Sequence, residues 1–298
     1  MPQAITESLN PATAAIDTLT SLEIISLINQ EDARVASAVQ AEMAHIARAV
    51  DIIVERLEGG GRLFYFGAGT SGRLGVLDAS ELVPTYSTPP GLVQAFIAGG
   101  DRALRHSVEA AEDDAAGGRQ IANEAGVGEK DVVVGITASG GAPWVLGAVE
   151  AARQRGAATI ALVCNPDSAL ASQVDVAIAP VVGPEVIAGS TRMKAGSAQK
   201  MVLNMLSTAA MIRMGKVYGN MMVDMRASNQ KLRERALDIL QKITGASAQT
   251  AGQVLQATDY EIKPALVMLL AGVSLEEARR RLEQAKGWVR AALEEQPS

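Results

Sequence analysis

The sequence predicts an α/β protein whose core is a doubly wound, parallel five-stranded sheet, with helices before it and a small helical domain after it. Short apolar runs alternate with longer amphipathic stretches through the middle of the chain, and the signal becomes wholly helical after Gly219. Brief β-branched strands separated by helices are typical of a parallel sheet covered on both faces. The expected division is 1–54 for an N-terminal arm and helices, 55–220 for the sheet domain and 221–298 for the helical domain.

The elements follow from the spacing of the apolar residues. The expected strands are 63–66, 92–97, 132–136, 159–163 and 174–178. The expected helices of the sheet domain are 71–82, 103–124, 142–154 and 191–213. Residues 1–20 are expected to be an arm and 21–58 two helices. The C-terminal helices are expected at 229–243, 247–257, 260–272 and 274–294, the last with Ser274 as its N-cap.

Composition excludes several classes of protein. The 298 residues are 48% hydrophobic, which is enough to build a sizeable core. Lys and Arg number 27 against 33 Asp and Glu, and without a dense basic run a net charge of −6 argues against nucleic-acid binding. One cysteine and two histidines exclude an intrachain disulfide and a His-dense metal site. We expect no metal and no cofactor.

The chain shows no sign of a membrane or export segment. No apolar stretch reaches the roughly 18 residues expected of a membrane span, and the opening MPQAITESLNPAT lacks a basic region followed by an apolar one. The expected location is therefore the cytoplasm. An enzyme of this composition has to rely on carboxylates, hydroxyls, Lys, Arg and backbone amides.

The first strand runs into a glycine-rich loop, GAGTSGR, from Gly67 onward. Glycines let the backbone approach a ligand closely, and a helix beginning near Ser71 directs free N–H groups at an anion. Gly67, Gly69 and Gly72 match the dinucleotide fingerprint, which also needs an acidic residue at the end of the second strand. Here that strand ends in two glycines before Asp101, which argues against a dinucleotide.

Two further polar loops follow strands. The third strand ends in TASGG, and hydroxyl–glycine turns after neighbouring strands suit one compact phosphate, with Thr70, Ser71 and Ser139 as side-chain donors. The cluster GSTRMKAGS opens the long helix after the fifth strand. Cations in the first turn of a helix oppose its dipole, so Arg192 and Lys194 are favoured there when an anion is nearby. The alternatives are tight connecting turns and solvated cations.

Two glutamates are candidates for acid–base catalysis. Glu81 is expected at the carboxyl end of the helix that begins in the glycine loop, where the dipole and apolar neighbours favour the neutral form that a general acid needs. Glu109, Glu112 and Asp113 are expected on one face of the 103–124 helix, and His106 precedes Glu109 by three residues. This face is either solvated or holds a tuned base, and the pattern does not choose between them.

Long strings of the chain resemble a known enzyme family. They are FGAGTSGRLGVLDASELVPTY, FIAGGDRALRHSVEAAEDD, DVVVGITASGG, GPEVIAGSTRMKAGSAQKMVLNMLST and GKVYGNMMVDMRASNQKL. These strings resemble the bacterial N-acetylmuramic acid 6-phosphate etherases over nearly the whole chain, and the glycine loop marks the wider sugar isomerase (SIS) fold.

The resemblance implies a homodimeric cytoplasmic enzyme without a metal that cleaves the D-lactyl ether of its substrate to N-acetylglucosamine 6-phosphate and D-lactate. It implies Glu81 and Glu112 as the functional pair, with Glu81 assigned as the acid, Glu112 as the base at C2, and an exchange of these roles left open. Gly69, Thr70, Ser71, Gly72 and Ser139 are expected to bind the phosphate. Glu185, Arg192 and Lys194 are expected to contact the sugar, the lactyl carboxylate or a dimer partner.

One departure and two rival functions accompany the resemblance. The chain has ASGGAPW at 138–144, where the family usually has ASGRTPY, so a cation and a hydroxyl are missing beside the second loop. This weakens the expected anion contacts there and leaves both glutamates intact. The rivals are a sugar-phosphate sensor similar to the animal glucokinase regulatory protein, which is longer and has two SIS domains, and an aldose–ketose isomerase of the same fold.

Overall fold

The computed structural model describes residues 5–225, 227 and 229–294. Packing divides the chain into two compact units. The first holds the chain up to Ser80 together with Gly91–Thr208, and the second holds Glu81–Pro90 together with the chain from Ala209. Helices α4 (Gly69–Tyr86) and α8 (Lys194–Arg213) contribute residues to both units. The three-part division expected from the sequence stays a prediction.

The first unit is built on the predicted sheet of five parallel strands, which is confirmed. The strands are β1 (Leu63–Gly67), β2 (Val93–Ile97), β3 (Val132–Ile136), β4 (Ala158–Leu162) and β5 (Val176–Ile178). Their order is β2-β1-β3-β4-β5. The chain leaves β1 toward β2 on one side and returns to β3 on the other, so the strand order reverses between β1 and β3. Ligands of open α/β sheets bind at such a switch point, outside the carboxyl ends of the strands.

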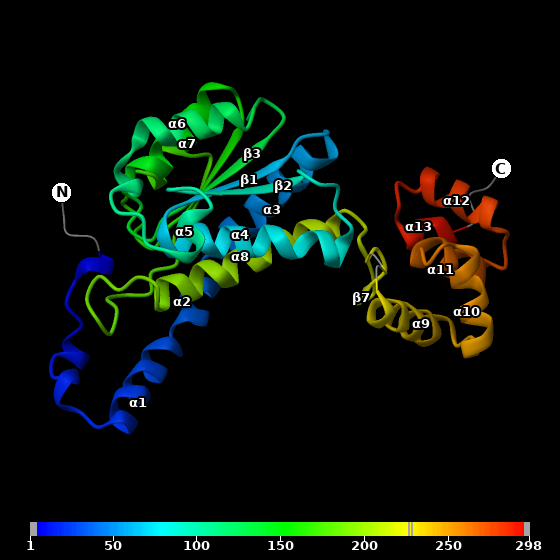
Figure 1. Ribbon diagram of the computed structural model, residues 1–298, viewed down its shortest axis with the longest axis horizontal. Helices are drawn as coiled ribbons and strands as arrows, with labels where there is room; N and C mark the ends of the chain where they lie inside the picture. Colours follow the sequence, from blue (N-terminus) through cyan, green and yellow to red (C-terminus); the bar gives the residue numbers. More distant parts are fainter. Residues whose placement is uncertain (1–4, 226, 228, 295–298) are drawn as a thin grey trace. The chain divides into compact units, whose positions relative to one another are not determined.

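Helices cover both faces of this sheet (Figure 1). The pair α6 (Ala115–Glu124) and α7 (Pro143–Gln154) lies on one face, where Phe64, Phe66 and Val133 pack with the apolar side of α7. These two helices are in close backbone contact, because a Cβ on Gly118 would lie 1.9 Å from the Trp144 carbonyl oxygen. The helices α3 (Met43–Glu58), α4 and α8 lie on the other face.

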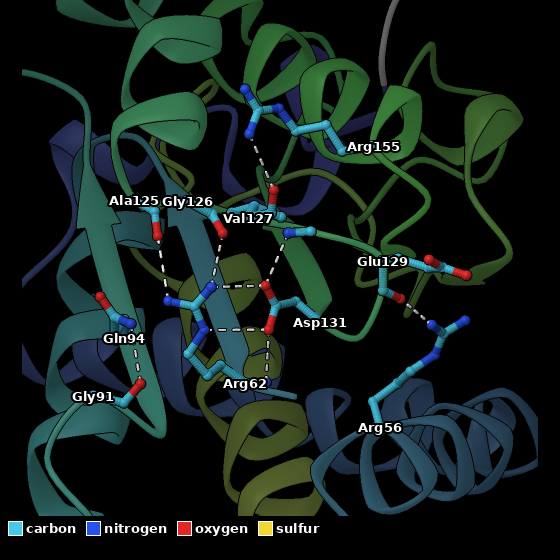
Figure 2. A network of polar contacts seen from close by, with 11 residues as sticks. Arg56, Arg62, Gly91, Gln94, Ala125, Gly126, Val127, Glu129, Asp131 and Arg155 are labelled. Carbon is cyan, nitrogen blue, oxygen red and sulfur yellow. Dashed lines mark hydrogen bonds and ion pairs between the residues drawn. The ribbon is translucent and has the colours of Figure 1, made fainter. Parts of the chain in front are cut away.

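The opposite, amino-terminal edge of the sheet is held by a charged network. Asp131 accepts hydrogen bonds from the backbone N–H of Arg62 at 2.8 Å and from its Nη2 at 2.9 Å. Figure 2 shows the Arg62 guanidinium reaching the carbonyls of Ala125 and Gly126 as well, and Arg56 bonded to the Glu129 carbonyl. This network ties the start of β1 to the start of β3, and it lies away from the edge where a ligand is expected.

The N-terminal segment differs from the two predicted helices. From residue 5 onward, where the description of this segment begins, it holds three helices, α1 (Ser21–Asp32), α2 (Val35–Ala41) and α3, preceded by three 3-10 turns at 5–7, 11–13 and 16–18. The expected arm is bound to the first unit rather than free of it. The Ile5 N–H donates to Asn165 Oδ1 at 2.7 Å, and the Asn165 amide donates to the Ala138 carbonyl of the loop after β3.

The second unit is helical, as predicted. Its helices are α9 (Gln230–Thr244), α10 (Ala248–Ala257), α11 (Ile262–Ala271), α12 (Leu275–Gln284) and α13 (Val289–Leu293), preceded by a short hairpin, β6 (Val217–Tyr218) and β7 (Met221–Met222). Ser274 is the N-cap of α12 and accepts from the Glu277 N–H, as predicted. The single helix expected over 274–294 is instead two helices, because Lys286 and Gly287 both have positive φ.

The prediction of a single helix over 103–124 was also wrong. The structure has a four-residue helix, α5 (Arg102–Arg105), then an extended His106, a 3-10 turn at Ala111–Asp113 and finally α6. Ala110 has φ +56°, a left-handed conformation that ends any continuous helix, and Asp114 caps a new one by accepting from the Gly117 N–H. The acidic residues around 112 therefore lie on a turn and not on a helix face.

Helix α4 differs from its prediction at its carboxyl end. Pro84 was expected to stop it, but the helix includes Pro84 and continues to Tyr86. Leu82 and Tyr86 are both buried, so tertiary packing holds the last turn in helical form although proline disfavours it. Glu81 consequently lies inside the helix, and its side chain is exposed. The predicted position of Glu81, at the end of the helix and among apolar neighbours, was therefore wrong.

Candidate active site

The loop after β1 places the amino end of α4 at the switch point of the sheet. The first N–H groups of a helix have no partner inside it, so this end carries free donors and the positive end of the dipole. Gly69, the first residue of the helix, has φ +53°, and a Cβ there would meet nothing within 4 Å. Its backbone is therefore open to a ligand. Glycine is favoured here by its conformation rather than by crowding.

Gly72 is needed for a different reason. A Cβ on Gly72 would lie 2.5 Å from the Ile97 side chain and 2.7 Å from the Gly67 carbonyl oxygen. The first turn of α4 can thus lie directly on the ends of β1 and β2 only when this residue has no side chain. Gly72 brings the helix end into place, and its predicted contact with phosphate stays a prediction.

Ser71 connects this helix end to α8. Its hydroxyl is buried and lies 2.9 Å from Gln199 Oε1, to which it donates. The Gln199 Nε2 is also buried and has no hydrogen-bond partner among the described residues. Thr70 lies beside the same helix, since a Cβ on Gly196 would be 3.3 Å from its methyl group. The amino ends of α4 and α8 are therefore neighbours.

The loop after β3 lies at the same edge of the sheet. Ser139 is half-buried, and its hydroxyl accepts from the Gly141 N–H at 3.2 Å and lies 3.4 Å from the Thr137 hydroxyl. Gly140 has φ +73° and packs so closely on Ser168 that a Cβ would lie 2.1 Å from its hydroxyl oxygen. The hydroxyl–glycine turn predicted from the sequence is thus present, and its part in binding an anion stays a prediction.

A pocket of about 230 Å³ opens beside the start of α4. Its walls come from the loop after β1 and from the segment between β2 and α6. The ionisable residues that line it are Arg73, His106, Glu109 and Glu112. The pocket therefore combines a cation, a histidine and two carboxyl groups at the carboxyl ends of two neighbouring strands.

Glu112 and Gly69 are the predicted site residues that line this pocket. Glu112 lies in the 3-10 turn Ala111–Asp113, directly after Ala110. A left-handed alanine costs on the order of 1 kcal/mol, and such strain occurs preferentially at functional sites. Glu81 belongs to the second unit and Glu112 to the first. Their joint action on one substrate stays a prediction.

Glu185 and Lys194, two residues expected to contact substrate, are bound within the protein. The Glu185 carboxylate is fully buried and accepts from the N–H groups of Lys194 at 3.0 Å and Ala195 at 2.9 Å, so it caps α8. The Lys194 ammonium is buried against Glu31 Oε2 at 2.5 Å. Arg192 is exposed. Of these two neighbouring helix ends, that of α8 already holds its own carboxylate, and that of α4 is the one open to an anion.

Burial and pairing change the pKa values of Glu185 and Glu31 in opposite directions. Burial raises the pKa of Glu185 above its ordinary value, against the two backbone hydrogen bonds that lower it. Burial also acts to raise the pKa of Glu31, but the bonded Lys194 ammonium and the charge of Arg34 outweigh it, and the net direction is down. Glu31 could not be predicted as the partner of Lys194, because nothing local in the sequence signals a partner 163 positions away.

Comparison with known proteins identifies the family. The chain is 52% identical to the N-acetylmuramic acid 6-phosphate etherase of Serratia proteamaculans (strain 568), over 97% of each chain. It is 53% identical to the protein of that name from Yersinia pseudotuberculosis serotype O:1b (strain IP 31758), over 97% of this chain and 98% of the relative. The chain belongs to the N-acetylmuramic acid 6-phosphate etherase family. The resemblance inferred from the sequence is confirmed.

Family models and solved structures agree on the fold of this etherase family member. The model of the glucokinase regulatory protein N-terminal SIS domain matches residues 45–153, and the SIS domain model matches 116–209. The model of the C-terminal lid domain of glucokinase regulatory protein matches 219–264. A phosphoheptose isomerase from Francisella tularensis superposes with a TM-score of 0.50 at 24% identity, covering 64% of this chain and 97% of that chain. The SIS-type fold is confirmed.

A partly buried polar cluster lies about one helical turn before Glu81 in the etherase chain. The Asp78 carboxylate accepts from the Tyr65 hydroxyl of β1 at 3.1 Å and from the Ser207 hydroxyl of α8 at 3.0 Å. Burial raises the pKa of Asp78 to about 6, against these two hydrogen bonds and the charge of Lys200, which lower it. The folded protein therefore holds a proton on Asp78 at pH values where the unfolded chain has lost it.

We expect Asp78→Asn to remove a pH-dependent loss of stability. Because the folded pKa lies above the ordinary 3.8, wild-type stability falls as the pH rises from about 4 to about 6 and stays lower above that. The free energy of unfolding of the variant, minus that of the wild type, should rise by about 2 to 3 kcal/mol over this window. Urea unfolding at pH 4.5, 5.5 and 7.5 measures it. Asp167→Asn, at an exposed position of the same unit, should track the wild type; a flat difference for Asp78→Asn would contradict the prediction.

Proposed function

We propose that this protein cleaves the D-lactyl ether of N-acetylmuramic acid 6-phosphate and releases N-acetylglucosamine 6-phosphate and D-lactate. The observation that carries the proposal is the 52–53% identity to named etherases over 97% of the chain. The pocket beside α4 supports it, because a carboxyl group, a cation and an anion-attracting helix end occur within one site. The enzyme is accordingly a carbon–oxygen lyase of amino sugar catabolism.

The proposed chemistry is an elimination followed by hydration. Opening of the sugar ring exposes an aldehyde, which acidifies the proton on C2. Glu112 takes this proton, the C3–O bond breaks, and the lactate oxygen receives a proton from Glu81. Water then adds its oxygen to C3 and a proton to C2. Two carboxyl groups suffice for every proton transfer, and the step needs no oxidant or reductant. The opposite assignment of the two glutamates is the alternative.

The phosphate is proposed to bind at the amino end of α4, with the backbone around Gly69 and Ser71 and the hydroxyls of Thr70 and Ser139, while the Ser71 hydroxyl donates to Gln199. The open Gly69 backbone and the free first-turn N–H groups support this anchor. Gly72 serves by letting the helix approach the strands. Arg192 is exposed, and we propose it as a surface contact for the substrate. Glu185 and Lys194 act through the fold at the amino end of α8.

The homodimeric, cytoplasmic enzyme implied by the resemblance is part of the proposal. No helix of the described chain has the length and apolar character to cross a bilayer. Dimerisation is tested by analytical ultracentrifugation of the purified full chain, where a single species of monomer mass would overturn it.

The decisive test is product analysis. Purified protein is incubated with N-acetylmuramic acid 6-phosphate in the presence of EDTA and without nucleotide, and D-lactate is measured with D-lactate dehydrogenase. We expect stoichiometric D-lactate and N-acetylglucosamine 6-phosphate. Tight binding of the sugar phosphate without lactate would favour the sensor, to which the matches with glucokinase regulatory protein domains also lend support. A ketose without lactate would favour an isomerase.

A further inference from the structure

The pocket that holds Glu112 contains one strong cation, Arg73. Arg73 lies in the second turn of α4, and its Nε donates to the Leu104 carbonyl at 3.2 Å. This bond fixes the guanidinium against the segment that follows β2. Its Nη1 and Nη2 groups have no hydrogen-bond partner within the described part of the chain. A half-buried guanidinium with two free terminal groups is a receptor for a planar anion.

The charges around the pocket show why an anion there needs Arg73. Glu109 and Glu112 contribute two negative charges when ionised, and His106 adds a positive charge only when protonated. Without Arg73, no side chain of fixed positive charge among the residues that line the pocket would offset these two carboxylates for an anion bound beside Glu112. With it, a carboxylate can lie beside Glu112 while the repulsion between the two is offset by the guanidinium.

The proposed substrate carries such a carboxylate next to the reacting carbons. In the lactyl group, the carboxylate is separated from C3 only by the ether oxygen and one carbon, and C3 is bonded to C2. If Glu112 takes the proton from C2, the lactyl carboxylate has to lie in the same pocket. We propose that Arg73 binds the lactyl carboxylate in a bidentate pair and thereby selects ethers of lactate. This inference rests on the proposed function and assigns the specificity within it.

The alternative source of a bound anion is the phosphate on C6, since Arg73 is also close to the loop that contains Gly69. N-acetylglucosamine 6-phosphate separates the two, because it has the phosphate and lacks the lactyl group. A substrate analogue whose lactyl carboxylate has been converted to the amide provides the complementary comparison, because it keeps the phosphate and loses only the charge of the carboxylate.

The experiment compares wild type, Arg73→Met and Arg73→Lys as full-length enzymes. Arg73→Met should lower kcat/KM for N-acetylmuramic acid 6-phosphate by about 10- to 100-fold, the range expected when a charged hydrogen-bonded pair is lost. Its inhibition constant for N-acetylglucosamine 6-phosphate should change less than about twofold. Arg73→Lys keeps the charge but loses the planar guanidinium, so its kcat/KM should lie between those of the wild type and Arg73→Met. Arg105→Met removes an exposed arginine of α5 that does not line the pocket, and it should behave as the wild type.

The substrate preference of the wild-type enzyme is a second measurement, which does not depend on whether the variants fold. It should prefer the natural substrate over the amide analogue by about 10- to 100-fold, and Arg73→Met should lose most of that preference. Equal weakening of substrate and N-acetylglucosamine 6-phosphate in Arg73→Met would place Arg73 on the phosphate and overturn the proposal. An unchanged preference for the carboxylate would overturn it as well.

Failure of the proposed etherase activity can be distinguished from failure of the proposed role of Arg73. If the wild type released no lactate, calorimetric binding of N-acetylmuramic acid 6-phosphate and N-acetylglucosamine 6-phosphate would still compare the two ligands. A preference for the lactyl sugar that disappears in Arg73→Met would support carboxylate recognition without catalysis. Equal affinity of the wild type for both sugars would overturn it.

Discussion

Replacing Glu112 with glutamine is expected to lower the rate of D-lactate release by about 10² to 10⁴-fold, because the amide cannot take the proton from C2. Glutamine has nearly the same shape as glutamate, and Glu112 makes no side-chain hydrogen bond within the described chain, so the fold should be unaffected. The measurement is kcat for D-lactate release by the full-length enzyme, with the unfolding transition recorded for each variant. Glu55→Gln, an exposed change on α3, is the matched control and should keep wild-type activity.

Glu81→Gln is expected to lose lactate release to a similar extent, but by a different step. In the proposed assignment, this variant can still remove the C2 proton and cannot protonate the leaving oxygen. Incubation in D₂O should then introduce deuterium at C2 of unconverted substrate with Glu81→Gln and not with Glu112→Gln. The reverse pattern would exchange the two roles. Full activity in either variant would contradict the two-glutamate mechanism.

Replacing Lys194 with methionine is expected to destabilise the first unit by about 3 kcal/mol, because the buried Glu31 carboxylate loses its buried partner and keeps only Arg34, whose side chain is 70% exposed. The two side chains are 2% and 5% exposed, so water cannot replace the lost ammonium. Glu31→Gln should have a comparable effect through the unpaired lysine. The measurement is the urea midpoint and slope of the full chain at pH 7.

The double variant Glu31→Gln with Lys194→Met separates pairing from packing. It removes both charges, so its free energy of unfolding should fall by less than the sum of the two single changes. Arg119→Met, which breaks an exposed pair with Glu150, is the control and should cost less than about 1 kcal/mol. Strict additivity of the two buried changes would show that the ion pair does not couple these positions.

Much of the fold could be predicted from the sequence, because its signals are local. The five strands are short apolar runs, and Ser274 stands three residues before Glu277, which is the spacing of a helix cap. Where tertiary packing outweighed local preference, the predictions failed. Pro84 remained helical because Leu82 and Tyr86 are buried around it. Residues 103–124 have a helical pattern, but Ala110 adopts a left-handed conformation that no pattern of side chains signals.

The candidate site could be predicted only in part, for the same reason. The glycine loop and Glu112 carry local or family signals, and both line the pocket. Arg73 was part of a recognised string, but its place in the pocket depends on the bond to Leu104, 31 residues away. Lys194 was expected to meet a ligand because a cation in the first turn of a helix is unfavourable. The anion that compensates it is Glu31, supplied by the distant helix α1.

The Gly118–Trp144 contact limits how sequences of this kind can diverge. A side chain at 118 would require α6 and α7 to separate, and the two helices together cover one face of the sheet. Position 118 is therefore expected to stay glycine in related sequences unless α7 is displaced in the same lineage. Position 141, where a Cβ would have a neighbour no closer than 3.8 Å, imposes no such restriction, and side chains of many sizes can be exchanged there over evolutionary time.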